Sequence, residues 1–288
     1  MRFDFIEAHR AMWPLPAMCE ALAVSKSGYF AWRDGRESPR RSRDRALTVQ
    51  IEVIHRESRQ TYGSPRVFQE LKAKGIALGR KRVERLMKTA GIAVRPLRRF
   101  VTTTQSDHDQ PIAPNILQQE FSATAANQRW VTDITYIPTD EGWLFLAAIM
   151  DLHSRRIVGW AMQPTMHRSL VLKALDMAVT DRRPSPGLIH HSDRGSQYAS
   201  EDYRAAMTAQ AMVASMSGRA CCYDNAAMES FWHTLKNELI HRYRYQTRDE
   251  AQRAIFEYIE VFYNRVRRHS SIGYLSPEAF ERQRPIAA

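Results

Sequence analysis

Three strand-like runs follow one another between residues 129 and 162, and their order restricts the fold more than any other feature. The runs cover 129–138, 143–151 and 156–162 and are rich in β-branched and aromatic residues. Alternating patterns come next, in the order helix 169–181, strand 188–191, helix 202–210, strand 212–216 and helix 224–243. Sequential strands followed by such alternation predict an α/β fold with a mixed sheet flanked by helices.

Three acidic residues stand at places in this pattern where a carboxylate needs a partner. Asp133 lies in the middle of the first strand, and Asp193 lies where the strand 188–191 gives way to a loop. Glu229 lies near the start of the helix that Asp224 is expected to cap. Carboxylate oxygens suit a hard divalent cation such as Mg²⁺, so the three acids are candidate metal ligands.

Other residues offer alternative sites. Each acid taken alone could be a solvated or capping residue, and Asp151 is a rival ligand that we expect to cap a turn instead. Asp224, assigned here to capping, has a place near the site as its alternative. A zinc site at His190, His191, Cys221 and Cys222 is disfavoured, because adjacent pairs cannot easily reach one tetrahedral ion and no Cys-x₂-Cys spacing accompanies them.

Size and charge narrow the class of partner. The chain has 288 residues, a formal net charge of +11 and an isoelectric point near 9.8, a balance typical of proteins that bind polyanions. The longest strongly apolar run, 143–150, is too short to span a membrane, and the first residues lack the apolar core of a signal peptide. Few cysteines fit a reducing compartment, so we expect a cytoplasmic protein without a membrane partner.

Helical patterns with basic residues precede the strands. Segments 16–33 and 64–89 each resemble a helix-turn-helix, with Ser25 and Ser64 as expected caps of helices. The second helix of such a unit enters the major groove of DNA. The predicted DNA contacts here are Lys26, Arg80, Lys81, Arg82 and Arg85. A packing motif with a solvated basic face is the alternative for both units.

A second basic group ends the long helical segment predicted over 247–268. Arg265, Arg267 and Arg268 could follow a phosphate backbone there, with a solvated helix end as the alternative. Between the N-terminal helices and the first strand, residues 100–114 are polar and predict a linker.

Three motifs in order resemble the catalytic core of DDE transposases and retroviral integrases. They are WVTDITY (130–136), HSDRGSQY (191–198) and DNAAMESF (224–231), and each contains one of the three acids. In detail they are similar to transposases of bacterial insertion sequences with two overlapping reading frames, and this chain resembles the second-frame product from about residue 5 to residue 277. The resemblance implies a ribonuclease H-like mixed sheet flanked by helices, preceded by a small all-α helix-turn-helix region.

The resemblance also implies a chemistry. Asp133 would bridge two Mg²⁺ ions, with Mn²⁺ as an expected substitute, and Asp193 and Glu229 would each complete one metal site. Lys236 lies two turns after Glu229 on the same helix face and would hold a DNA phosphate. The site would first free a 3′-hydroxyl at the inverted end of the element and then join that hydroxyl to target DNA. The alternatives are a ribonuclease H-like nuclease without strand transfer and a non-catalytic helix-turn-helix regulator.

The same resemblance implies partners and an organisation in parts. Expected partners are DNA, as terminal inverted repeats and as target, further copies of the chain on that DNA, and a first-frame protein, in a bacterial cytoplasm at the nucleoid. The predicted parts are a helical DNA-binding region (1–100), a linker (101–120), a ribonuclease H-like catalytic core (121–245) and a C-terminal helix with a basic tail (246–288).

Overall fold

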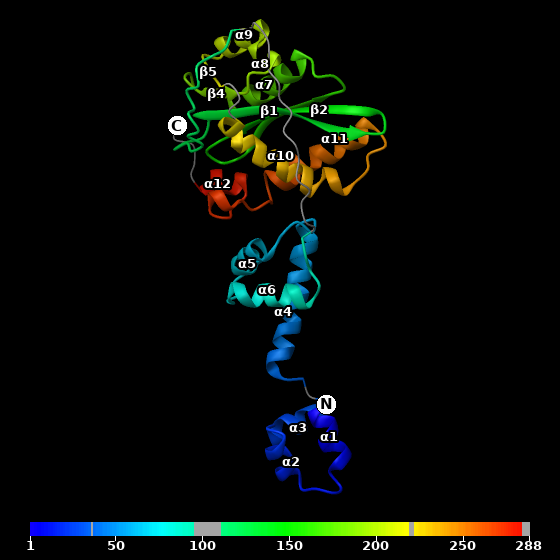
Figure 1. Cartoon of the computed structure of the whole chain (residues 1–288). Helices are drawn as coiled ribbons and strands as arrows, with labels where there is room; N and C mark the ends of the chain where they lie inside the picture. The colour runs from blue at the N-terminus through cyan, green and yellow to red at the C-terminus, as the bar shows by residue number, and fades with distance from the viewer. Residues whose placement is uncertain (36, 95–110, 219–221, 284–288) are drawn as a thin grey trace. The chain divides into compact units, whose positions relative to one another are not determined.

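The chain falls into an all-helical unit, Met1–Arg95, and a unit with a β-sheet, Pro96–Ala288 (Figure 1). The structure is a computed structural model, and it describes residues 1–35, 37–94, 111–218 and 222–283. No helix within these ranges is both long enough and apolar enough to cross a membrane.

The first three helices form a small cluster. They are α1 (Arg2–His9), α2 (Leu15–Ala21) and α3 (Lys26–Arg33). Ile6, Met18, Cys19 and Tyr29 are buried between them. Ser25 caps α3 as predicted, because its Oγ accepts a hydrogen bond from the backbone N of Gly28 at 3.0 Å.

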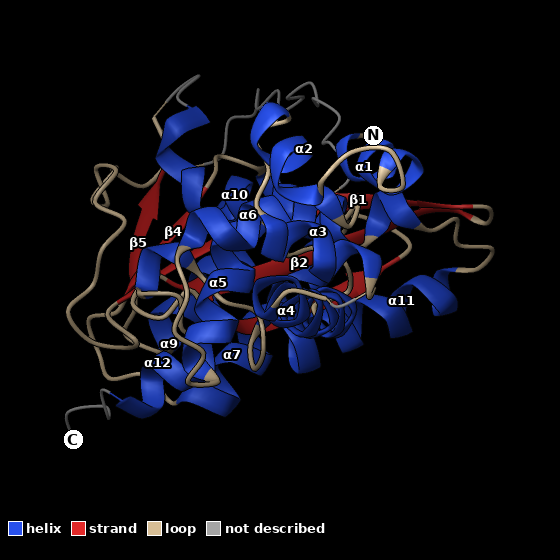
Figure 2. Ribbon diagram, turned by 90° about the horizontal axis from the view of Figure 1, so that it is seen from below, coloured by secondary structure: helices blue, strands red, loops and turns tan. Residues whose placement is uncertain are grey.

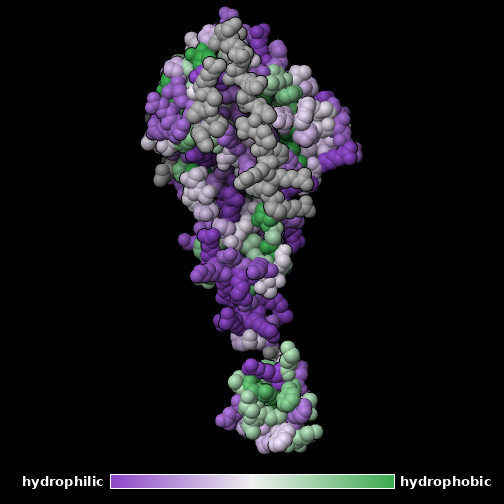
Figure 3. Space-filling view, in the orientation of Figure 1, coloured by the Kyte–Doolittle hydropathy of each residue, from purple (hydrophilic) through white to green (hydrophobic). Residues whose placement is uncertain are grey.

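The next three helices also pack on one another, and the first of them was not predicted. They are α4 (Pro39–Glu57), α5 (Ser64–Ala73) and α6 (Arg80–Thr89). Helix α4 begins at Pro39, and Ser38 caps it by accepting from Arg41 N at 3.2 Å. The expected cap at Ser64 was wrong by one residue, because Gly63 precedes the first turn of α5. Figure 3 shows mostly hydrophilic atoms over α4–α6 and more hydrophobic atoms over α1–α3.

The sheet of the second unit has five strands in the order β3-β2-β1-β4-β5 (Figure 2). Its strands are β1 (Arg129–Thr139), β2 (Gly142–Asp151), β3 (Ile157–Gln163), β4 (Ile189–Ser192) and β5 (Val213–Met216). The first three pair antiparallel, whereas β4 pairs parallel with β1 and β5 pairs parallel with β4. The predicted mixed sheet is confirmed.

Helices cover both faces of this sheet (Figure 1). One face carries α7 (Arg168–Arg182), α8 (Ser196–Ala199) and α9 (Glu201–Ala209), and the other carries α10 (Ala226–Glu238), α11 (Arg248–Phe256) and α12 (Pro277–Gln283). Helix α7 approaches β3 closely, since a Cβ added at Gly159 would lie 2.3 Å from the carbonyl oxygen of Ala174. Buried residues of α7–α9 complete the main core around Trp130 and Ile149.

The C-terminal helical segment is interrupted where a single helix was expected. After α11 the chain makes a π-helical stretch, Glu257–Tyr263, and then leaves the helix. This places the Asn264 side chain against the edge strand β3, where it accepts from Ile157 N at 3.0 Å and donates to Ile157 O at 2.9 Å. The amide side chain thus pairs with exposed backbone of an edge strand, a tertiary demand that helix periodicity does not reveal.

Residues 111–120, placed within the predicted linker, lie along β5. Ser215 Oγ accepts hydrogen bonds from Ile116 N at 2.9 Å and Leu117 N at 3.2 Å, and Leu117 is buried. The other half of the predicted linker, 101–110, lies outside the described residues. The remaining part boundaries stay predictions.

Candidate active site

Asp133 occupies the middle of β1 on the face covered by α10. Its Oδ1 accepts from Ile134 N at 2.8 Å, and its Oδ2 accepts from Trp232 Nε1 of α10 at 2.9 Å. The side chain is half-buried, so both oxygens have found donors that replace water.

Asp193 directly follows β4 and lies beside Asp133 because of the parallel pairing. Val131 pairs with His191, and continuing this register by two residues sets Asp193 next to Asp133. Its Oδ1 accepts from Gly195 N at 2.9 Å, which turns the chain sharply after the strand. Two acids far apart in sequence therefore meet at one point of the sheet.

Glu229 lies in the exposed first turn of α10, whose start is tied to β1. Asn225, the residue before this helix, donates from Nδ2 to Thr132 O at 3.1 Å, next to Asp133. Asp224 was expected in the capping place but has another task. It is buried and accepts from Gly218 N at 2.7 Å, Asn115 Nδ2 at 2.9 Å and Gln119 Nε2 at 2.9 Å. The helix start is thus set by contacts to three distant segments.

The three acids influence one another electrostatically. Burial, followed by the charge of Asp193 and to a lesser extent that of Glu229, raises the pKa of Asp133 to about 7, against hydrogen bonds from Trp232 and Ile134 that lower it. A carboxylate whose pKa is raised by two neighbouring carboxylates marks a site with a net demand for positive charge. Such a site can be satisfied by a proton or by a metal ion.

The donor set suits a hard divalent cation. Within the described residues, no three His, Cys, Asp or Glu side chains are close enough to hold a metal ion as they stand. Trp232, Ile134 and Gly195 donate hydrogen bonds to carboxylate oxygens of Asp133 and Asp193. Three carboxylates are nonetheless the ligands that Mg²⁺ prefers.

Lys236 of α10 reaches β1 from the same helix as Glu229. Its Nζ lies 5.0 Å from the centre of the Tyr136 ring. Burial lowers the pKa of Lys236, and the neighbouring Tyr136 and Asp133 act in the opposite direction. The ammonium group therefore lies in the field of the acidic site.

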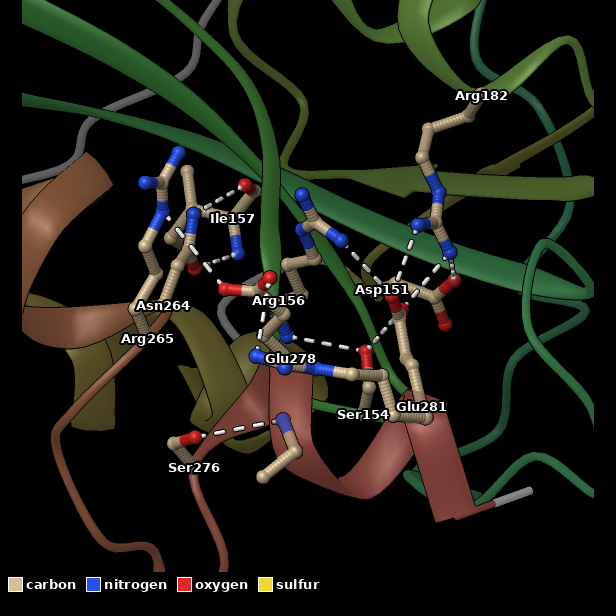
Figure 4. A network of polar contacts seen from close by, with 12 residues as sticks. Asp151, Ser154, Arg156, Ile157, Arg182, Asn264, Arg265, Ser276, Glu278 and Glu281 are labelled. Atoms are coloured by element: carbon tan, nitrogen blue, oxygen red, sulfur yellow. Dashed lines mark hydrogen bonds and ion pairs between the residues drawn. The ribbon is translucent and has the colours of Figure 1, made fainter. Parts of the chain in front are cut away.

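Asp151, the rival acid, ends β2, where it pairs with Trp130 near the start of β1. It is buried and accepts from Asn127 N at 2.8 Å and His153 N at 2.9 Å, the second bond capping a turn as expected. Figure 4 shows Asp151 near Arg182, which also binds Glu281 of α12 at 2.8 Å. This network joins α12 to the core and is separate from the three acids.

The two histidines after Ile189 are structural. His190 Nε2 shares a hydrogen bond with Tyr203 Oη at 2.7 Å, and His191 bonds Ser215 and Ser217 through its two ring nitrogens at 2.9 and 3.2 Å. Burial lowers the pKa of His190 to about 3 and that of His191 to about 4, so both are neutral at physiological pH. Cys221 and the Cys222 side chain, the other zinc candidates, lie outside the described residues.

The basic residues predicted to bind DNA are in different environments. Lys26, Arg80 and Lys81 are exposed. Arg82 and Arg85 of α6 each donate to Asp44 of α4 at 2.7 Å, and these hydrogen bonds, led by that of Arg85, hold the pKa of Asp44 below its ordinary value. These two arginines therefore also join α6 to α4.

The three C-terminal arginines differ more strongly in their exposure and in their partners. Arg265 is exposed, 3.7 Å from Glu278, and Arg268 donates to Tyr274 O at 2.8 Å. Arg267 is buried and donates to both oxygens of Glu238, at 2.8 and 2.7 Å. A buried bidentate pair leaves Arg267 unable to follow a phosphate backbone, so we do not retain it as a DNA contact.

Sequence reasoning missed the residues that hold the acids in place. Trp232 lies three residues after Glu229, a spacing that puts both on one side of the helix and could have signalled a shared site. Asn225 and Asp224 stand within the third motif, but their partners Thr132, Asn115 and Gln119 are about 90 to 110 residues away in the chain, and no local pattern reveals these contacts.

The mixed five-stranded sheet flanked by helices is the fold of an integrase-type core, a class of polynucleotidyl transferase. Family comparison agrees: integrase core domain models match residues 123–222 and 229–284, and an HTH-like domain model matches residues 42–100. The HTH-like match contains the second predicted helix-turn-helix and also α4.

Relatives match the chain over almost its full length. An uncharacterized 31 kDa protein of insertion element IS600 from Shigella sonnei is 49% identical over 94% of this chain and 100% of its own length. Transposase InsF for insertion sequence IS3A from Escherichia coli strain K12 is 43% identical over 98% of each chain. The chain belongs to the IS3 family of insertion-sequence transposases, and the predicted family is confirmed.

Solved structures show weaker likenesses. A chain of the simian T-cell lymphotropic virus intasome in complex with PP2A regulatory subunit B56 gamma aligns over 83% of this chain and 77% of its own, with 15% identity and a TM-score of 0.48. The HTLV-2 integrase catalytic core domain in complex with magnesium, in its dimeric form, aligns over 55% of this chain and 97% of its own, with 14% identity and a TM-score of 0.42. The family assignment depends on the closer relatives and not on these structures.

Proposed function

We propose that this protein catalyses DNA transposition, cutting a strand at each inverted end of its element and joining the freed 3′-hydroxyl to target DNA. The observation that carries the proposal is that Asp193 follows β4 beside Asp133 of β1, and that Glu229 of α10 is near enough for its charge, after that of Asp193, to raise the pKa of Asp133. Two bound Mg²⁺ ions would activate the attacking oxygen and stabilise the leaving oxygen of the phosphodiester.

The chain's own residues have distinct tasks in this proposal. Asp133 would be the ligand shared by the two metal ions, and its Oδ2 accepts a hydrogen bond from the Trp232 indole in this structure. Asp193 and Glu229 each complete one site. Asn225 holds the start of α10 on β1, so the position of Glu229 is set before DNA arrives.

DNA would be held by cations around the site and on the helical unit. Lys236 would bind a phosphate of the strand at the acids, because its ammonium group lies near Asp133 on the helix of Glu229. The further DNA contacts that we propose are Lys26, Arg80, Lys81, Arg82, Arg85, Arg265 and Arg268. We also propose that several copies assemble on the two ends, together with a first-frame partner protein.

The test is joining of a labelled duplex that carries the element's end to a target plasmid in Mg²⁺. The chain is compared with its Glu229→Gln and Asp133→Asn variants, and with Glu201→Gln as a matched control. Glu201, like Glu229, is an exposed acid in the first turn of a helix, but it lies on α9. We expect joined product from the unsubstituted chain and the control, and none from the two site variants.

Each alternative has its own outcome. Cleavage without joined product would indicate a nuclease, and end binding that survives Asp133→Asn with no cutting by any form would indicate a regulator. If the unsubstituted chain is inactive, the assay is repeated with the first-frame protein added. Equal joining by the chain and Glu229→Gln would refute the assignment of the acids.

A further inference from the structure

Two large aromatic side chains stand in solvent on the hairpin that joins β1 to β2. Tyr136 is 44% exposed and Trp143 is 51% exposed, and their rings meet edge to face with centres 5.0 Å apart. They occupy diagonal places in the ladder, since Tyr136 pairs with Phe145 and Pro138 pairs with Trp143. A joined pair of exposed rings is more informative than single exposed residues, because a flat ligand can stack on one ring while the other ring borders it.

The hairpin beneath these rings is held firmly. Arg248 of α11 donates to Trp143 O at 3.0 Å, to Glu141 O at 2.7 Å and, from its backbone, to the Glu141 carboxylate at 2.8 Å. Asp140 N also donates to Tyr245 O at 3.0 Å. The rings therefore keep their place without a ligand, which reduces the entropy lost when one binds.

The surroundings of the pair favour nucleic acid as the ligand. Lys236 places its ammonium group 5.0 Å from the centre of the Tyr136 ring, so a cation for phosphate and a ring for a base lie together. Tyr136 follows Asp133 by three residues on one strand, so their backbones are about 10 Å apart at the rise of a β-strand. Their side chains leave opposite faces of the strand, and Lys236 interacts with both of them. With a rise of about 3.4 Å per nucleotide, this backbone distance corresponds to about three nucleotides along DNA.

We propose that Tyr136 and Trp143 form a stacking site for one unpaired nucleobase of the strand bound at the acids, within about three nucleotides of the cleaved phosphate. The inference rests on the proposed function and adds to it that the DNA end is opened beside the cut. Stacking on one ring and contact with the other offset part of the cost of unpairing the base, so an end that is already unpaired binds more tightly than a paired one.

The experiment uses the full chain with Glu229→Gln, so that the bound DNA is not cut. End duplexes carry 2-aminopurine, whose fluorescence falls on stacking, at each of the three nucleotides beside the cleaved phosphate in turn. Each is made both fully paired and with those three nucleotides unpaired. The added substitutions are Tyr136→Ala, Trp143→Ala, the ring-preserving Tyr136→Phe and the control Phe256→Ala. Phe256, on α11, is 51% exposed like Trp143 and meets Trp160 edge to face.

We expect quenching at one of the three positions and about tenfold tighter binding of the unpaired end than of the paired end. Tyr136→Ala and Trp143→Ala should abolish both effects, whereas Tyr136→Phe and Phe256→Ala should retain them. Unfolding curves of all variants show whether the substituted chains remain folded, and Tyr136→Phe tests the ring without removing its packing.

Three results would overturn the inference. Binding by the Glu229→Gln chain without quenching, and with an unchanged preference for the unpaired end after Tyr136→Ala, would remove the stacking site. Joining by the chain that keeps Glu229 would leave the transposase proposal intact. A change in sedimentation on Tyr136→Ala with unchanged fluorescence would make the pair a protein interface instead. No binding or joining of the end by the unsubstituted chain, even with the first-frame protein, would instead refute the proposed function.

Discussion

Replacing Arg267 with Met should destabilise the catalytic unit by about 3–5 kcal/mol, because it leaves the Glu238 carboxylate buried without its cation. The side chains are only 5% and 10% exposed, and the guanidinium donates to both carboxylate oxygens at 2.7 and 2.8 Å. Tyr258 Oη donates to the same carboxylate at 2.8 Å and cannot replace the lost charge. The pair joins the end of α10 to the segment after the π-helical stretch.

A double-mutant cycle separates the cost of the unpaired Glu238 charge from the other effects of Arg267→Met on the free energy of unfolding. Arg267→Met combined with Glu238→Gln removes both charges and keeps an acceptor for Tyr258, so the double variant should be more stable than Arg267→Met alone by about 1–3 kcal/mol. Urea unfolding followed by tryptophan fluorescence measures each free energy. Arg265→Met is the control, since Arg265 is 64% exposed and 3.7 Å from Glu278, and its loss should cost under about 0.5 kcal/mol.

Two results would refute this reasoning. A cost below about 1 kcal/mol for Arg267→Met would mean that water or another group satisfies Glu238. A double variant no more stable than Arg267→Met would mean that the loss comes from packing and not from an unpaired charge. If the Arg267–Glu238 ion pair contributes so little, Arg267 becomes a candidate DNA contact again.

Three further predictions concern other parts of the second unit. Because burial lowers the pKa of His190 to about 3, the unfolded chain binds a proton that the folded chain does not, and stability should fall as pH decreases from about 6.5. His190→Gln, which keeps a polar partner for Tyr203, should reduce that slope by up to about 1.4 kcal/mol per pH unit in denaturant titrations. Burial raises the pKa of Glu281, but hydrogen bonds and charge from Arg182 lower it more, so the stabilisation is present at neutral pH and lost as pH falls through the lowered pKa. Glu281→Gln should therefore destabilise the protein more at pH 7 than in acid below the lowered pKa of Glu281, and equal losses at both would contradict the ion-pair account. Gly159→Ala should cost about 1–3 kcal/mol in the same unfolding assay, because the added Cβ would lie 2.3 Å from Ala174 O, and an unchanged midpoint would mean that α7 can shift.

Local patterns were enough to predict most of the second unit. All five strands lie within one or two residues of their predicted bounds, because runs such as 129–139 combine β-branched residues with clear turns at both ends. The candidate ligands Asp133, Asp193 and Glu229 also came from local context, since each stands in a motif with its own recognisable neighbours. Their metal-binding role stays a proposal.

Local patterns did not predict helix α4, the π-helical stretch or the role of Arg267. Helix α4 was not predicted, although its cap at Ser38 and Pro39 is visible in hindsight, because its first two turns are strongly basic and show no apolar stripe. The π-helical stretch depends on Asn264 reaching β3, which lies more than 100 residues earlier in the chain. In the sequence, Arg267 looks like a phosphate-binding residue, because it is an arginine in a basic group. Its contact with Glu238, which only the structure shows, removes it from that role.

The sequence by itself determined which segments become strands and helices, which acids are candidate ligands, and that the chain is strongly basic. These properties depend on side chains a few residues apart, so they can be inferred from the chain alone. The tertiary structure decided which charges are neutralised inside the protein and which aromatic rings remain in solvent. Burial and pairing depend on residues brought together by the register of β1 with β4 and by the packing of α10 and α11 on the sheet, and a linear pattern carries no record of those distances.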